Sequence, residues 1–238
     1  MIKAVLFDLD GTLLPMDFDE FTGGYFKLLA KKAIPYGYEP QKLIETIWGG
    51  CKAMAMNDGH ATNEDVFWNY FASVYGEDKL KDKVIFDEFY ATEFDQAKSF
   101  CGYDPEARNI VKWLQEKDVR TILATNPIFP EVATKHRIEW VGLDVSDFEF
   151  YTVYETSRHA KPNPVYYSDV LEQAGLKADE VVMIGNDVVE DLAATKIGIT
   201  VFLLTDCIIN KENRDISDIP HGGFDELKQF LISMLDTK

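Results

Sequence analysis

Four short runs of consecutive apolar residues mark the chain. The first is Ala4-Val5-Leu6-Phe7, and a polar segment that contains a glycine follows it directly. Short apolar runs bounded by turn residues are typical of strands that are buried on both faces of a parallel sheet. Three similar runs follow much later, at residues 121–124, 181–184 and 199–203, and amphipathic helical patterns separate most of them. The pattern predicts an α/β fold with a doubly wound, Rossmann-like parallel sheet.

Residues 15–102 follow a different pattern, because their apolar positions recur every three or four residues, as on one face of a helix. We expect four helices in this segment. They begin after the N-cap residue Asp17, at Pro40, after the N-cap residue Thr62 and near residue 79. The fourth helix is expected to reach about residue 97, and the pair Gly49-Gly50 could kink the second.

The strand-and-helix pattern resumes at Asp104-Pro105, an N-cap residue followed by proline at the first helical position. The sequence thus predicts an α/β core made of residues 1–14 and 103–238, with an all-helical cap inserted at residues 15–102. Ligands bind at the carboxyl ends of the strands in an open parallel sheet, so we expect the insertion to cover that edge as a lid. The side chains in it that could line a pocket are Phe18, Phe21, Tyr25, Trp48 and Lys52.

Composition and charge narrow the class of partner. With 46% hydrophobic and 27% charged residues, the chain has the composition of an ordinary globular protein. Its formal net charge of -17 argues against nucleic-acid and membrane partners, because binding to either would need a basic face. A phosphorylated substrate would therefore need local positive charge from a metal ion, a lysine or a helix N-terminus.

The cysteines and the N-terminus indicate the compartment. Cys51, Cys101 and Cys207 lack the spacing of a metal site and are odd in number, which fits a reducing cytosol better than a disulfide framework. The apolar run before Asp8 is too short for a signal peptide or a membrane span. We expect a cytoplasmic protein that is a monomer.

The chemistry that stands out is the string Asp8-Leu9-Asp10-Gly11-Thr12 at the end of the first predicted strand. Two carboxylates one residue apart at a strand end can converge on one point, and the glycine allows a sharp turn. Close carboxylates repel each other unless a cation or a shared proton intervenes, so the pair implies a divalent metal or a raised pKa on one member. Either arrangement serves phosphoryl transfer.

This string resembles the first motif of the haloacid dehalogenase-like (HAD) hydrolase superfamily, and candidates for its other three motifs follow in order. Thr125 and Asn126 stand at the end of the second predicted strand, and Lys161 precedes a proline. The fourth candidate is the segment 185–191, with the sequence Gly-Asn-Asp-Val-Val-Glu-Asp. The resemblance spans essentially the whole chain and places residues 15–102 where the superfamily has a helical C1-type cap.

The resemblance implies roles for these residues. Asp8 would be the nucleophile and Asp10 the general acid and base, while Thr125, Asn126 and Lys161 would bind the phosphoryl group. The cofactor would be Mg²⁺, held by Asp8, by the main-chain carbonyl of Asp10 and by the fourth motif. There the family usually has aspartate after the glycine, whereas this chain has Asn186, so either Asn186 or the neighbouring Asp187 would bind the metal. Asp191 would support the site or simply open the next helix.

The function expected from these residues is magnesium-dependent hydrolysis of a small-molecule phosphomonoester through an aspartyl-phosphate. Asp10 favours this reaction over carbon-halogen cleavage, because the resemblance implies that dehalogenases need no acid at that position. A phosphomutase would use the same residues. A binding or regulatory module without catalysis is the alternative from a different class.

Overall fold

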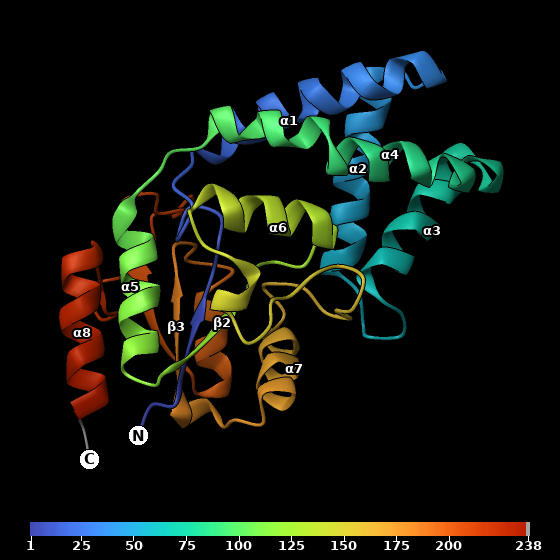
Figure 1. Ribbon diagram of the computed structural model, residues 1–238. Helices are drawn as coiled ribbons and strands as arrows, with labels where there is room; N and C mark the ends of the chain where they lie inside the picture. Colours follow the sequence, from blue (N-terminus) through green and yellow to red (C-terminus); the bar gives the residue numbers. More distant parts are fainter. Residues whose placement is uncertain (237–238) are drawn as a thin grey trace.

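Five parallel strands form one sheet at the centre of the α/β part of the molecule (Figure 1). The computed structural model describes residues 1–236. The strands are β1 (Ala4–Phe7), β2 (Arg120–Leu123), β3 (Val181–Gly185), β4 (Thr200–Leu204) and β5 (His221–Gly222), in the order β2-β1-β3-β4-β5. The first four coincide with the predicted runs to within one residue, which confirms the predicted fold class. The two-residue β5 is too short to leave a pattern in the sequence.

Helices cover both faces of the sheet because successive side chains of each buried strand point to opposite sides. Val5 and Phe7 pack with α5 (Pro105–Glu116) and α8 (Phe224–Asp236). Ala4 and Leu6 pack on the other face, with α7 (Pro164–Ala174) and the 3₁₀ helix η6 (Leu192–Ile197). Two apolar layers therefore enclose the sheet, and β1 and β3 are buried along their whole length.

The segment between β1 and α5 contains helices alone, and we call residues 18–100 the helical insertion. Its elements are α1 (Phe18–Ala33), η1 (Ile34–Tyr36), α2 (Pro40–Ala55), α3 (Asn63–Tyr75), η2 (Glu77–Asp82), α4 (Lys83–Ala91) and η3 (Glu93–Phe100). The caps expected at Asp17 and Thr62 are present, since each side chain accepts a hydrogen bond from the main chain of the first helical turn.

The fourth predicted helix is wrong in its extent, because 3₁₀ turns replace both of its ends. Only Lys83–Ala91 is α-helical, and the chain leaves the helical region at Thr92, where φ is -130° and ψ is -73°. The turn brings Phe94 and Ala97 into the interior, where both are fully buried. The burial of these two apolar side chains offsets the loss of regular helix.

At Gly49-Gly50, where the sequence allowed a kink, α2 continues as one helix from Pro40 to Ala55. The two glycines serve packing instead. A Cβ atom at Gly49 would lie 2.2 Å from the Tyr70 hydroxyl oxygen, and one at Gly50 would lie 2.5 Å from the ring of Phe67. The missing side chains therefore let α3 pack directly against α2.

The remaining elements are α6 (Glu131–Trp140), η4 (Val145–Asp147) and η5 (Ala178–Glu180). In Figure 1, α6 lies between the sheet and the helical insertion, and it contacts α4 and η3. The carboxyl end of β1 and the helical insertion thus face each other across one edge of the sheet. Within residues 1–236, no helix is both long and apolar enough to span a bilayer.

Candidate active site

Asp8 is fixed at the carboxyl end of β1 by the hydrogen-bond ladders on both sides of that strand. Its main-chain N–H donates to the Ile184 carbonyl of β3 at 2.9 Å, and Ala124 N–H donates to the Phe7 carbonyl at 2.7 Å. Gly11 then turns the chain with a φ of +80°, close against the side chain of Asn186. The predicted strand-end position of the Asp-x-Asp pair is therefore correct, and both side chains line the same cavity.

Lys161 links Asp8 to a second carboxylate. Its ammonium nitrogen lies 2.8 Å from Asp8 Oδ1 and 2.7 Å from Asp191 Oδ1, and the lysine side chain is fully buried. Burial raises the pKa of Asp8 to about 7, while Lys161 opposes that rise. Burial would lower the pKa of Lys161, but Asp191 and Asp8 outweigh it, so that pKa lies above its usual value. The ammonium group of Lys161 thus sits between the carboxyl groups of Asp8 and Asp191.

The loop after β3 is organised around Asp191. Its Oδ2 accepts hydrogen bonds from the main-chain N–H groups of Asn186 and Asp187, both at 2.9 Å. The Asn186 side chain is engaged at both ends, because its oxygen accepts from the Thr12 hydroxyl at 3.0 Å and its nitrogen donates to the Cys207 carbonyl at 2.7 Å. Asp191 is therefore a buried organiser of this loop and not an exposed acid of a helical first turn.

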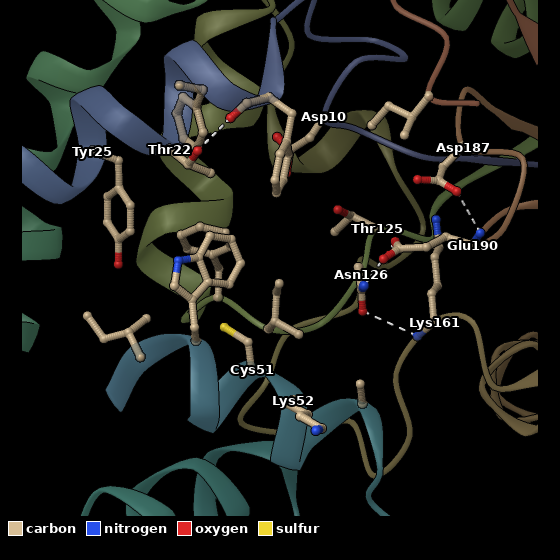
Figure 2. Close-up of a pocket in the computed structure, with 18 of the residues that line it drawn as sticks. Asp10, Thr22, Tyr25, Cys51, Lys52, Thr125, Asn126, Lys161, Asp187 and Glu190 are labelled. Carbon is tan, nitrogen blue, oxygen red and sulfur yellow. Dashed lines mark hydrogen bonds between the residues drawn. The ribbon is translucent and has the colours of Figure 1, made fainter. Parts of the chain in front are cut away.

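Thr125 and Asn126 follow β2 and line the same cavity as Asp8. Figure 2 shows both near Lys161 and Glu190. The Thr125 carbonyl accepts from the Tyr166 hydroxyl at 2.9 Å. The Asn126 side chain joins two other parts of the site, since it donates to Glu190 Oε2 at 2.9 Å and accepts from Lys161 N–H at 3.2 Å. Glu190 was not among the predicted site residues. Burial raises its pKa to about 8, although Lys161 opposes this.

Asp10 has a partner that sequence reasoning missed. Arg137, on α6 and 0% exposed, donates from Nη1 to Asp10 Oδ2. The guanidinium is held in place by hydrogen bonds to the Thr134 hydroxyl and the Ala133 carbonyl, both at 3.2 Å, and by the ring of Phe129 at 4.3 Å. The other oxygen of Asp10, Oδ1, is buried and has no protein partner. An arginine in a helix usually lies on the protein surface. The one sequence signal for a buried arginine was that a buried carboxylate such as Asp10 needs a cationic partner.

Comparison with known protein families identifies the family of this chain. Residues 2–198 match the model of the haloacid dehalogenase-like hydrolases. The chain belongs to that family. This confirms the predicted resemblance and makes the protein an enzyme of the HAD-like hydrolase class.

Two HAD-like relatives are phosphatases by name. The chain is 27% identical over 212 residues to a phosphoglycolate phosphatase of Vibrio parahaemolyticus, with 86% of this chain and 84% of the relative covered. It is 24% identical over 209 residues to a ribulose-1,5-bisphosphate 5-phosphatase of Halopiger xanaduensis, with 85% and 84% covered. The fold is also similar to that of a 2-haloacid dehalogenase from Pseudomonas syringae, with a TM-score of 0.63, 20% identity and coverage of 98% and 99%.

The HAD-like site offers oxygen donors for a metal ion. Within residues 1–236, no three His, Cys, Asp or Glu side chains cluster closely enough to hold a metal alone. Mg²⁺ usually needs only one or two carboxylates, together with water and substrate phosphate. Carboxyl groups also outnumber cations here: the carboxyl groups belong to Asp8, Asp10, Asp187, Glu190 and Asp191, and the buried cations are Lys161 and Arg137. The residues present therefore fit a divalent cation with oxygen ligands.

A cavity of about 620 Å³ extends from Asp8 and Thr125 to the helical insertion. All five side chains that the sequence suggested for a pocket line it: Phe18, Phe21, Tyr25, Trp48 and Lys52. Figure 2 shows Cys51 and Lys52 of α2 across the cavity from Asp10 and Thr125. Residues of the helical insertion and residues at the strand ends therefore line one cavity.

Proposed function

We propose that this chain is a magnesium-dependent phosphatase that hydrolyses small-molecule phosphomonoesters through a phosphorylated Asp8. The observation that carries the proposal is the carboxylate of Asp8 at the end of β1, held by Lys161 at 2.8 Å, with Asp10 facing the same cavity. The two relatives that are named as phosphatases support this class of substrate.

The reaction proceeds in two displacements. An oxygen of Asp8 attacks phosphorus, the bond from phosphorus to the ester oxygen breaks, and the leaving oxygen takes a proton from Asp10 as the alcohol departs. Water then attacks phosphorus of the aspartyl-phosphate, gives its proton to Asp10 and releases inorganic phosphate and free Asp8. Thr125, Asn126 and Lys161 bind the phosphoryl oxygens, and the charge of Lys161 offsets the negative charge on them.

Arg137 positions the acid. It binds Oδ2 of Asp10 and so fixes the carboxyl group that exchanges a proton with the leaving group and with water. Because the guanidinium is fixed by Thr134, Ala133 and Phe129, the carboxylate keeps one orientation through both steps.

Mg²⁺ would be bound by the carboxylate of Asp8, the main-chain carbonyl of Asp10 and the carboxylate of Asp187. Bound there, it would offset charge on the transferring phosphoryl group. Asp187 is favoured over Asn186 because its two main-chain hydrogen bonds both go to Oδ1, which leaves Oδ2 for a cation, whereas the one side-chain oxygen of Asn186 accepts from Thr12. Asp187 also lines the cavity and carries the charge that Asn186 lacks.

Residues 15–102 act as the cap of this enzyme and select the leaving group, while residues 1–14 and 103–238 supply the chemistry. The rings and Lys52 of the insertion line the part of the cavity that extends away from Asp8. A substrate can therefore contact both parts only when its phosphate lies at Asp8 and its alcohol under the insertion.

The test is release of inorganic phosphate from 4-nitrophenyl phosphate with and without Mg²⁺. We expect turnover that a chelator abolishes and added Mg²⁺ restores, no reaction with 2-chloropropionate, and transfer of phosphate from trapped Asp8-phosphate to water. Absence of phosphate release at every Mg²⁺ concentration would refute the proposal. Transfer to an added sugar phosphate instead of water would make the enzyme a phosphomutase.

A further inference from the structure

The cavity is much larger than the phosphoryl group that Asp8 would attack. Its volume of about 620 Å³ lies well within the range of about 300 to 1,000 Å³ that is typical of sites for drug-sized ligands. Phosphate and a two-carbon acid would fill only the end near Asp8. The rest of the space, beneath the helical insertion, belongs to the leaving group.

Aromatic rings from separate elements surround that space. Phe21 and Tyr25 come from α1, Trp48 from α2, Tyr90 from α4, and Phe129 from the segment after β2. The rings of Tyr25 and Phe129 pack edge to face with centroids 5.7 Å apart. Such walls favour a flat ring in the ligand, because aromatic pairs add stacking or edge contacts to the burial of apolar area.

The charges in the lining disfavour a second anionic group on the substrate. Six acidic side chains line the cavity against four basic ones. Of the basic side chains, Lys161 is bound to Asp8 and Asp191, Arg214 lies 2.7 Å from Glu212, and Lys211 lies over the exposed ring of Phe18 at 5.4 Å. Neither Lys211 nor Lys52 is ion-paired within residues 1–236, and Lys52, which is exposed to solvent on α2, is the rival partner for a carboxylate on a small substrate.

The hydroxyl groups in the aromatic part offer one hydrogen bond to a neutral ligand. Tyr25 and Tyr90 share a hydrogen bond of 2.6 Å between their hydroxyl oxygens. The two hydroxyls carry two hydrogens, and one of these makes the shared bond, so the other can bind an oxygen of the ligand. The aromatic part thus combines apolar walls with one neutral donor.

We propose that the enzyme's substrates are phosphomonoesters of uncharged alcohols that carry an aromatic ring, with the ring among Phe21, Tyr25, Trp48 and Tyr90. This inference rests on the proposed phosphatase function and names its substrate class. It separates this chain from the phosphoglycolate phosphatase that it resembles at 27% identity, since phosphoglycolate is small and carries a carboxylate.

The experiment compares kcat/KM for 2-phenylethyl phosphate, ethyl phosphate and 2-phosphoglycolate, which are all esters of primary alcohols. We expect 2-phenylethyl phosphate to exceed ethyl phosphate by about 10- to 100-fold, the factor that burial of one ring supplies. 2-Phosphoglycolate should fall below both.

Two variants assign the preference to the cavity. Trp48→Ala should lower kcat/KM about tenfold for 2-phenylethyl phosphate and far less for ethyl phosphate, which has no ring to contact Trp48. Tyr36→Ala is the matched control, because Tyr36 is 46% exposed, close to the 43% of Trp48, and lies outside the cavity. It should change neither value.

The opposite result is equally clear. If 2-phosphoglycolate is the best of the three esters and Lys52→Gln removes that advantage, the aromatic substrate class is wrong while the phosphatase function stands. If Trp48→Ala lowers kcat/KM by the same factor for all three esters, the aromatic rings do not select among the substrates and the inference fails. If none of the esters is hydrolysed in the presence of Mg²⁺, the phosphatase function itself fails.

Discussion

The two ends of the cavity are built in opposite ways. At the end near β1, polar side chains are tied to one another through short bonds, as Lys161 ties Asp8 to Asp191. At the end under the helical insertion, rings pack at centroid distances near 5 to 6 Å, and the hydroxyl groups of Tyr25 and Tyr90 share a hydrogen bond. One end can fix a reaction geometry, and the other can accept a range of shapes.

This difference predicts how much a single substitution should cost at each end of the cavity. Removing one member of the polar end leaves a buried charge without a partner, which costs far more than the lost bond itself. Removing one ring from the aromatic end removes apolar contact and leaves space, which a neighbour or a ligand can fill in part. Variants at the two ends should therefore differ in both the size and the kind of their effects.

The largest effect is expected for Asp8→Asn. An amide cannot replace the carboxylate as nucleophile, so kcat should fall by at least about 1,000-fold. Phosphate release from 4-nitrophenyl phosphate measures the loss. Asp19→Asn makes the same chemical change at an exposed position of α1 and should keep full activity. Comparable activity in the two variants would remove Asp8 from the mechanism.

Lys161→Met should damage both stability and activity. It leaves the carboxylates of Asp8 and Asp191 buried without their cation, and losing one partner of a buried pair costs about 3 to 5 kcal/mol. Urea denaturation measures the free energy of unfolding. Lys83→Met is the control, because the pairs of Lys83 with Asp87 and Glu64 are partly exposed and should contribute under about 1 kcal/mol. Equal losses would mean that the polar end is not the more tightly coupled one.

At the polar end, the residues that could be predicted from the sequence are those that come directly after a strand. Asp8, Thr125 and Asn186 each come directly after, or two residues after, a short apolar run, and parallel strands bring such positions to one edge. Arg137 could not be predicted, because it reaches Asp10 from α6 across 127 positions of sequence. Its burial depends on how α6 packs, which no local pattern records.

The effect of Arg137→Gln on kcat/KM should depend on how much the leaving group needs a proton. If Arg137 orients Asp10 as the acid, its loss should lower kcat/KM for ethyl phosphate by about 100-fold or more, which is the usual contribution of general acid catalysis. 4-Nitrophenyl phosphate has a leaving group that needs little protonation, so its kcat/KM should fall far less. A purely structural role would lower both by the same factor, and Arg137→Lys should restore part of the difference.

The metal can be assigned by binding alone. Asp187→Asn should weaken Mg²⁺ binding about tenfold or more, measured by calorimetry or by the rise in Tm that Mg²⁺ produces. Asn186→Asp tests the rival ligand and keeps the side-chain size. Should Asn186→Asp tighten binding while Asp187→Asn leaves it unchanged, the ligand would be residue 186, and Asp187 would serve only to accept from Val189 and Glu190.

The fold was more predictable at the sheet than in the insertion. The apolar runs specify buried strands, and caps such as Asp17 and Thr62 mark helix starts, because each signal is local. The break at Thr92 and the continuity of α2 at Gly49-Gly50 depend on which side chains pack there. The aromatic end of the cavity also depends on packing. The sequence shows only aromatic residues at helical spacing, and such residues lie more often in a hydrophobic core than in a pocket.

The smallest effect is expected at the tyrosine pair of the aromatic end. Tyr25→Phe or Tyr90→Phe keeps the ring and removes one hydroxyl, so each should lower the free energy of unfolding by about 1 to 2 kcal/mol, because the remaining hydroxyl loses its partner. The double variant leaves no unpaired hydroxyl and should be nearly as stable as the original chain. Urea denaturation of the four proteins gives the coupling energy. A double variant that loses the sum of both single effects would mean that each hydroxyl bonds to water independently, and the aromatic end would then be wetter and more polar than its rings indicate.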